Sequence, residues 1–219
     1  MLRILSTVLI VLGFTACAQA DGGNAGATDY YRPGHVVPAD ADTRRGDVPR
    51  DAYGRPFTYE GLGQALPAFS GSMADGTSFA TADLEGRWTV IEVWGIWCHD
   101  SRNDAPYAAA LSTALGQDPD VDFMSIHTPH RANRADKAFR GYTSVSAWFE
   151  EKGWSFPTVV DTDASIRELL RIRWTPTYLV IAPDLSVQGF RTGLADAGDM
   201  AVKDFVHAIN ETRQDWNGS

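Results

Sequence analysis

Hydrophobic residues fall into short continuous runs separated by stretches with one apolar side, which is the pattern of an α/β protein. The longest run, residues 87–95 (RWTVIEVWG), is apolar at almost every position and predicts a central strand covered on both faces. A helix is expected over 101–115, with Pro106 as a candidate kink, and a second strand over 121–127. This strand–helix–strand succession predicts a right-handed parallel unit.

Shorter patterns predict the remaining elements of a mixed sheet flanked by helices. An Asp75–Gly76 turn marks a hairpin within residues 66–80, and a Pro183–Asp184 turn joins an antiparallel pair of strands. Gly153 is expected to end one helix and Asp163 to cap the next. The further helices are expected over 144–153, 163–173 and 197–210, and the further strands over 158–161, 177–183 and 186–192.

The chain divides into four parts by composition. Residues 21–61 are rich in Gly, Pro, Asp and Arg with little apolar periodicity, which predicts a flexible linker or a tether loosely docked through Tyr30, Tyr31 and Tyr53. The packed domain is expected over 62–212, and residues 213–219 form a C-terminal tail.

The first twenty residues are expected to be a signal segment. Arg3 precedes an apolar stretch, residues 4–14, that is too short to span a bilayer comfortably. The sequence FTAC at 14–17 resembles a bacterial lipobox, in which Cys17 is acylated, although Phe14 replaces the usual leucine. Cleavage after Ala20 is the alternative. We favour the lipoprotein, which predicts a bacterial envelope protein on the periplasmic side, held to a membrane through lipidated Cys17 alone.

Charge and cysteine content limit the function. The 219 residues carry a formal net charge of −9, which argues against nucleic-acid binding because phosphate contacts need clustered Lys and Arg. Cys17 is removed or lipidated on export, so Cys98 is the remaining thiol and no internal disulfide can form. A lone thiol in an oxidising compartment is either packed in the core or used in chemistry.

The order of elements, with Trp97 and Cys98 at a strand-to-helix turn, resembles the thioredoxin fold and, more closely, the TlpA/ResA group of thiol-disulfide oxidoreductases. The resemblance covers about residues 62–210. It is carried by the motifs LPAF, TVIEVWGIWC, FPTVVDTD and WTPTYLVIAPD. It implies an α/β thioredoxin-like fold with a central mixed β-sheet flanked by helices.

The resemblance also assigns roles by position. Cys98 matches the attacking cysteine of the family's Cys-x-x-Cys motif, and Pro176 matches the cis-proline that faces it. Thr175 matches the residue whose backbone pairs with an extended substrate, and Trp97 lies on the rim of the groove. Because Cys98 immediately precedes a helix, the free backbone N–H groups and the helix dipole favour its charged thiolate form.

Ser101 departs from the family, because the second cysteine belongs at this position. A Cys98 thiolate can still form a mixed disulfide with a partner. A serine hydroxyl is too weak a nucleophile to displace that partner, so Ser101 can only donate a hydrogen bond to the thiolate. A thiol from outside the protein must therefore resolve the mixed disulfide.

Two carboxylates complete the expected catalytic set. Glu92 matches the buried acid of thioredoxins, and burial would raise its pKa; the alternative is a strand residue that faces solvent. Asp104 matches the acid that follows the family's second cysteine; the alternative is an ordinary charge on the surface of the helix's first turn.

Histidines form a third candidate feature. His127 and His130 lie at the carboxyl end of the strand beside the Cys98 strand, at the sheet edge where open α/β folds hold ligands. With His99 and Cys98 they are candidates for a copper or zinc site. The alternative is that they lie singly in a loop.

The sequence therefore predicts an exported, cofactor-free, monothiol thiol-disulfide oxidoreductase. Its expected partners are exported protein thiols or disulfides, or a small thiol, with an external resolving thiol. Two alternatives remain: a non-catalytic module that binds a partner in the groove around Trp97 and Pro176, and a Cys/His metal-handling protein.

Overall fold

The computed structural model describes residues 29–44 and 48–216. The expected signal segment, including Cys17, lies outside the described residues. Among the described helices, none is long and apolar enough to cross a membrane.

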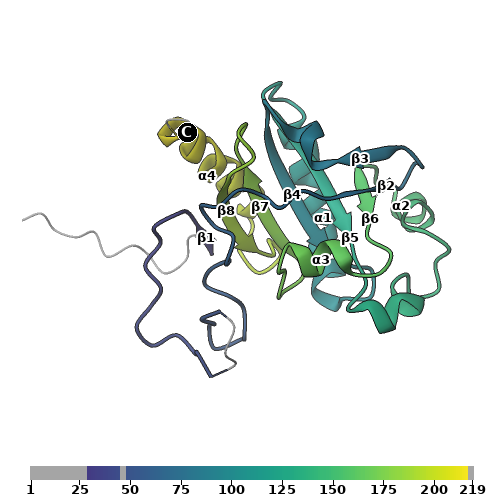
Figure 1. Ribbon diagram of the computed structural model, residues 1–219, viewed down its shortest axis with the longest axis horizontal. Coiled ribbons are helices and arrows are strands. Elements are labelled where there is room, and N and C mark those ends of the chain that lie inside the picture. Colours follow the sequence, from purple (N-terminus) through teal and green to yellow (C-terminus); the bar gives the residue numbers. More distant parts are fainter. Residues whose placement is uncertain (1–28, 45–47, 217–219) are drawn as a thin grey trace, which may run out of the picture.

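A mixed eight-stranded sheet forms the centre of the described protein (Figure 1). β4 (Trp88–Trp94) pairs in parallel with β5 (Val121–His127) and antiparallel with β7 (Thr177–Ile181). All seven residues of β4 are buried, which confirms the prediction from its continuous apolar run. The strand order is β1-β8-β7-β4-β5-β6-β2-β3. The other strands are β1 (Tyr30–Tyr31), β2 (Ser70–Met73), β3 (Ser78–Ala80), β6 (Thr158–Val160) and β8 (Val187–Thr192).

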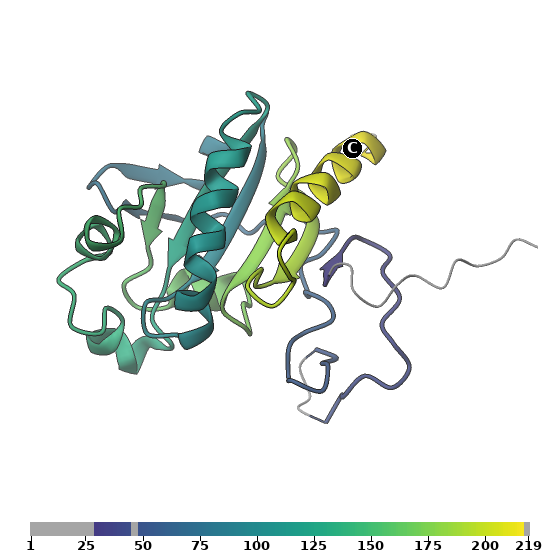
Figure 2. The ribbon, with the colours of Figure 1, turned by 180° about the vertical axis from the view of Figure 1, so that it is seen from behind.

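Helices cover both faces of the sheet. The long helices α1 (His99–Leu115) and α4 (Ala201–Asp215) lie side by side on one face (Figure 2), and α2 (Val145–Lys152) packs into the same core. The short α3 (Ser165–Leu169) packs on the opposite face. Two 3₁₀ segments, η1 (Thr81–Leu84) and η2 (Ala132–Lys137), complete the elements. The predicted α/β thioredoxin-like architecture, a mixed sheet flanked by helices, is confirmed.

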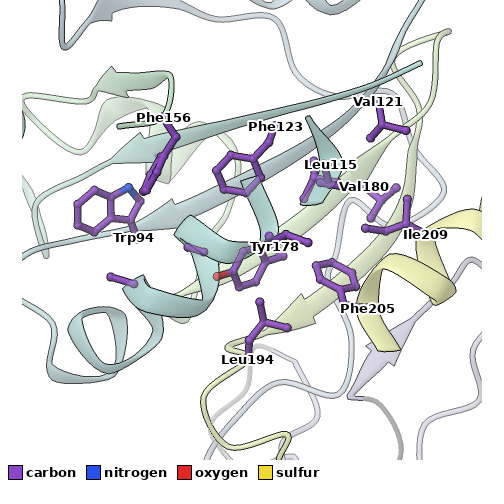
Figure 3. Close-up of a cluster of buried hydrophobic side chains, with 14 of the residues drawn as sticks. Trp94, Leu115, Val121, Phe123, Phe156, Tyr178, Val180, Leu194, Phe205 and Ile209 are labelled. Atoms are coloured by element: carbon purple, nitrogen blue, oxygen red, sulfur yellow. The ribbon is translucent and has the colours of Figure 1, made fainter. Parts of the chain in front are cut away.

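The larger core fills the space between the sheet and α1, α2 and α4. Figure 3 shows part of it, with Phe205 and Ile209 of α4 packed beside Val180 and Tyr178 of β7. Burying each such large side chain stabilises the fold by about 1.5–3 kcal/mol. This core holds α1, and with it the residue that precedes α1, in a fixed position on the sheet.

Two predicted helices differ from the structure by four residues or more at one end or both. The helix expected over 163–173 is wrong in length: α3 ends at Leu169, and Arg171 has a φ of 54°, which is not helical. Its first turn is held mainly by Asp161, whose carboxylate accepts the backbone N–H groups of Ile166 and Arg167 at 3.3 and 3.0 Å. Asp163, the expected cap, accepts the backbone N–H of Ser165 at 3.0 Å, one residue before those that Asp161 holds. The final helix begins at Ala201, later than expected, and runs to Asp215, into the expected tail.

The described part of the expected linker docks on the edge of the sheet. Tyr30 and Tyr31 pair with β8 as strand β1, and the Tyr30 hydroxyl lies 2.8 Å from Thr212 Oγ1 on α4. Only glycine fits at position 189, which lies against the Tyr30 ring, because a Cβ there would lie 2.1 Å from the Tyr30 hydroxyl oxygen. Tyr53, by contrast, is 82% exposed.

Candidate active site

The candidate site is the four-residue loop, residues 95–98, that joins β4 to α1. It lies at the carboxyl ends of the parallel strands β4 and β5, where ligands bind in open α/β sheets. Gly95 is required at its start, because a Cβ there would lie 2.2 Å from Trp97 Nε1 and 2.8 Å from the Thr128 carbonyl oxygen. Trp97 Nε1 donates a 2.7 Å hydrogen bond to that carbonyl, which fixes the indole against the end of β5.

Cys98 is the N-cap residue of α1 and is partly exposed. Its sulfur therefore lies at the positive end of the helix dipole, where negative charge is stabilised. The thiol donates to the Thr175 carbonyl oxygen at 3.3 Å, and the Thr175–Pro176 peptide bond is cis. The structure thus brings together Cys98, Thr175 and Pro176, the three residues that the sequence placed across the groove.

Two buried side chains, Ser101 and His127, accept hydrogen bonds from the backbone of the 95–98 loop. Both are 0% exposed. Ser101 Oγ accepts the Gly95 N–H at 3.3 Å, and His127 Nε2 accepts the Ile96 N–H at 3.3 Å. Within the described residues, no hydrogen bond joins Ser101 to the Cys98 sulfur. In this state the serine positions the backbone that leads to the cysteine.

Two arginines near the Cys98 sulfur are not among the residues that the sequence predicts for the site. The Arg102 guanidinium, one helical turn beyond Cys98, donates to the Ile96 and Cys98 carbonyl oxygens at 2.8 and 2.9 Å. The Arg167 guanidinium from α3 lies 5.7 Å from the centre of the Trp97 ring. A Cys98 thiolate attracts both cations and raises their pKa values, against a larger lowering by burial. Spacing alone could have revealed Arg102 at i+4; Arg167 is brought to the site by tertiary packing.

Glu92 is buried in the middle of β4, which excludes the solvent-facing alternative. It is 1% exposed, and neither carboxyl oxygen has a hydrogen-bond partner among the described residues. Burial, and secondly the charge of Asp104, raise the pKa of Glu92 well above 4.5. Burial therefore favours the protonated, neutral form of Glu92 over the ionised form.

Asp104 is buried too, at 1% exposure, which excludes the surface alternative. Its carboxylate accepts hydrogen bonds from the Tyr178 hydroxyl at 2.5 Å and from the Leu194 and Ala195 N–H groups at 2.5 and 2.6 Å. Burial raises the pKa of Asp104, although these donors act in the opposite direction. Figure 3 shows the Tyr178 hydroxyl turned toward α1.

Asp104 also ties α1 to the Pro176 loop. A Cβ at Gly193 would lie 3.0 Å from Asp104 Oδ1 and 3.2 Å from Pro176 Cγ, so the three groups are closely packed. The buried guanidinium of Arg191, opposite Tyr178 in the β7–β8 ladder, donates to the Gly193 carbonyl oxygen at 3.0 Å. Tyr178 and Arg191 were missed because nothing in their strands marks them as polar partners of a helix residue.

The structure does not bring the four candidate metal ligands together. The His127 nitrogen that faces the loop is occupied by Ile96 N–H, and burial lowers the pKa of His127 to about 4. His99 is exposed, and its ring is hydrogen-bonded to the Asn103 side chain. His130 packs edge-on against Trp97, with the two ring centres 4.9 Å apart. Across residues 29–44 and 48–216, no group of three His, Cys, Asp or Glu side chains is arranged to hold a metal ion.

The fold, with a helix-capping cysteine that faces a cis-proline, defines a protein of the thioredoxin-fold redox class. Residues 62–190, more than half of the chain, match the model of the AhpC/TSA family, and the chain belongs to that family.

Comparison with individual proteins agrees with this class. Thiol-disulfide oxidoreductase ResA of Bacillus subtilis strain 168 is 23% identical over 147 residues, 67% of this chain and 75% of ResA. A DsbF homologue from Corynebacterium diphtheriae has a similar structure, with a TM-score of 0.53 and 14% identity over 86% of this chain and 96% of that chain. The thioredoxin domain of a thiol-disulfide oxidoreductase from Bacteroides vulgatus gives a TM-score of 0.50, with 19% identity over 68% of this chain and 97% of that chain. At these identities the solved structures show the fold alone.

Proposed function

We propose that this protein is a monothiol thiol-disulfide oxidoreductase that works through a mixed disulfide at Cys98. The observation that carries the proposal is the position of the sulfur: partly exposed, at the N-terminus of α1 and 3.3 Å from the Thr175 carbonyl oxygen. A packed core cysteine would have no approach from solvent. The relationship to ResA supports redox chemistry on sulfur.

The proposed reaction has two exchanges. The Cys98 thiolate attacks one sulfur of a disulfide; a Cys98–substrate disulfide forms, and the other sulfur leaves as a thiolate that takes a proton from water. A thiol from outside then attacks the substrate sulfur and releases Cys98. Ser101 cannot perform this second step, because its oxygen does not displace sulfur.

The surrounding residues have supporting roles in this proposal. Trp97, Thr175 and Pro176 form the surface on which the substrate's disulfide lies. Ser101 holds the loop through the Gly95 N–H, and Asp104 fixes α1 against the segment that follows β8. Glu92 has a raised pKa and no hydrogen-bond partner among the described residues, and it is the acid in the core that can exchange a proton.

We further propose that the protein works in the bacterial envelope, on the periplasmic side, anchored through lipidated Cys17. The basis is the sequence of residues 1–20, with Arg3, an apolar stretch and FTAC. Its substrates are then exported protein thiols or disulfides, or a small thiol. Mass spectrometry of the N-terminal peptide from the native host tests this: a diacylglyceryl group on Cys17 supports it, and an N-terminus at Asp21 contradicts the anchor.

The catalytic proposal is tested with a fluorescence-quenched peptide disulfide and 2-mercaptoethanol as the outside thiol. We expect the wild-type protein to accelerate release of the fluorophore and Cys98→Ser to abolish the acceleration. Ser101→Ala should slow the reaction without abolishing it, because the serine holds the loop and does not react. An equal rate for wild type and Cys98→Ser would refute the proposal.

A further inference from the structure

Some arginines and lysines of this acidic protein form ion pairs with carboxylates, and others do not. Many in the described part of the chain form ion pairs, among them Arg87 with Asp122, Arg171 with Glu60, and Arg213 with Asp118. A group around the Cys98 loop has no carboxylate within ion-pair distance in the described residues: Arg102, Arg131, Arg134, Lys137, Arg140 and Arg167. Arg191 and Lys203 also form no ion pair within the described residues, but they lie on β8 and α4, outside this group.

Three of these cations line a pocket beside the reactive cysteine. The pocket has a volume of about 290 Å³ and is lined by Trp97, His130, Arg131, Arg134 and Lys137; we call it the basic pocket. Trp97 directly precedes Cys98 and packs against the His130 ring. In Figures 1 and 2 the short turns of η2, which carry Arg134 and Lys137, lie beside the N-terminal end of α1.

The cations of this region repel one another. Burial lowers the pKa of His130 most, and Arg167, Arg131 and Arg134 lower it further. Burial likewise lowers the pKa of Arg102 most, and Arg140 adds to this lowering. Along residues 129–140 four cations face a single carboxylate, Asp136. A bound anion reduces the repulsion between clustered cations and so stabilises the cluster. Guanidinium groups bind carboxylates especially well, through two parallel hydrogen bonds.

We propose that the basic pocket binds the carboxylates of a small thiol or its disulfide, and so places that molecule's sulfur at Cys98. This inference rests on the proposed monothiol function and specifies the class of the outside thiol. The pocket's volume suits a small molecule rather than a folded partner. The ligand's carboxylates contact Arg131, Arg134 and Lys137, and its carbon chain lies on the Trp97 ring.

The reaction at this pocket balances without a further reagent. An anionic disulfide RSSR accepts the Cys98 thiolate, giving Cys98–S–SR and one RS⁻, which is protonated by water. A second RS⁻, bound in the basic pocket, attacks the sulfur of the attached SR group, re-forms RSSR and frees the Cys98 thiolate. When a substrate thiolate R′S⁻ attacks the attached SR group, R′SSR forms and the Cys98 thiolate is freed, so the substrate is oxidised and the small disulfide is consumed. When the substrate enters as R′SSR, the Cys98 thiolate takes its SR group and releases R′S⁻, and a bound RS⁻ then removes that group as RSSR, so the substrate is reduced and the small thiol is oxidised.

The test compares three symmetric disulfides that differ in charge: 3,3′-dithiodipropionate (anionic), bis(2-hydroxyethyl) disulfide (neutral) and cystamine (cationic). Intact mass spectrometry follows adduct formation on Cys98 of the full chain at low salt. We expect the anionic disulfide to react about tenfold faster than the neutral one, and the cationic one to react slowest. The preference should shrink as salt is added.

Two variants make the same charge reversal, one inside the basic pocket and one far from it in the sequence. Arg134→Glu should reduce the ratio of anionic to neutral rates, whereas Lys203→Glu, an exposed lysine on α4, should leave that ratio unchanged. Equal rates for all three disulfides in the wild type would overturn the basic pocket and leave the monothiol function standing. No adduct with any of them would refute the monothiol function itself.

The dependence of the adduct rate on disulfide concentration distinguishes binding in the pocket from general electrostatic attraction of anions to the surface. We expect the rate with dithiodipropionate to saturate and succinate to compete with it. A rate that rises linearly and ignores succinate would overturn the pocket in favour of an open basic surface, which suits an acidic protein partner.

Discussion

Glu92→Gln is expected to stabilise the protein increasingly as the pH rises above about 4.5. Glu92 is fully enclosed in the core, and within residues 29–44 and 48–216 neither of its oxygens has a hydrogen-bond partner. Burial, and secondly the charge of Asp104, raise its pKa well above 4.5. In the unfolded chain the same carboxyl is hydrated and ionises normally. Between the unfolded and the folded pKa, only the unfolded state loses its proton. This favours unfolding, so the wild type loses stability as the pH rises.

The magnitude follows from this linkage. Each pH unit within that window lowers the free energy of unfolding by about 1.4 kcal/mol, and glutamine does not titrate. Glu92→Gln should therefore gain about 1.4 kcal/mol over the wild type for each pH unit from 4.5 up to the raised pKa of folded Glu92. The constant cost of burying an amide cancels in this comparison.

Urea unfolding followed by tryptophan fluorescence at pH 4.5, 5.5 and 6.5 measures the effect. Glu85→Gln, which removes an exposed carboxyl group, corrects for the change in net charge. A difference between wild type and Glu92→Gln that stays constant with pH would show that Glu92 ionises in the folded state as it does in water, and the reasoning would be wrong.

Two further substitutions test the surroundings of the cysteine. Tyr178→Phe removes one of the three donors to the buried Asp104 carboxylate and should lower the free energy of unfolding in urea at pH 7 by about 1.5–3 kcal/mol. Tyr107→Phe, on the same helix as Asp104, is the control, and a loss no larger than the control's would contradict the importance of the Tyr178 hydrogen bond. Ser101→Cys supplies the missing second sulfur, so Cys98 adducts should convert to an internal disulfide that intact mass spectrometry detects as lost hydrogens; a persisting adduct would show that the two positions cannot bond.

The sequence predicts most of the fold because its strands are strongly patterned. Residues 121–127 form β5 with the expected bounds, and Gly153, with a φ of 68°, ends α2 as expected. The helix over 163–173 was overestimated because its helical pattern continues past Leu169, whereas the chain turns at Arg171 to bring Pro176 to the cysteine. Tertiary contact overrides local propensity at that point.

The candidate site was predictable only in part. The groove residues Cys98, Thr175 and Pro176 come together as the resemblance implied. The role of His127 as an acceptor for the loop, and the gathering of Arg102, Arg167 and η2 around Trp97, depend on contacts between distant segments. No spacing in the sequence records them, since each partner lies on a different element.

The central claim is that folding makes the Cys98 sulfur reactive rather than sealed. The most direct measurement is the rate at which bis(2-hydroxyethyl) disulfide forms an adduct on Cys98, by intact mass, in folded protein and in urea-unfolded protein at the same pH. Our account predicts faster reaction in the folded protein, where the sulfur sits at the N-terminus of α1 beside two guanidinium groups. Reaction only after unfolding would contradict it.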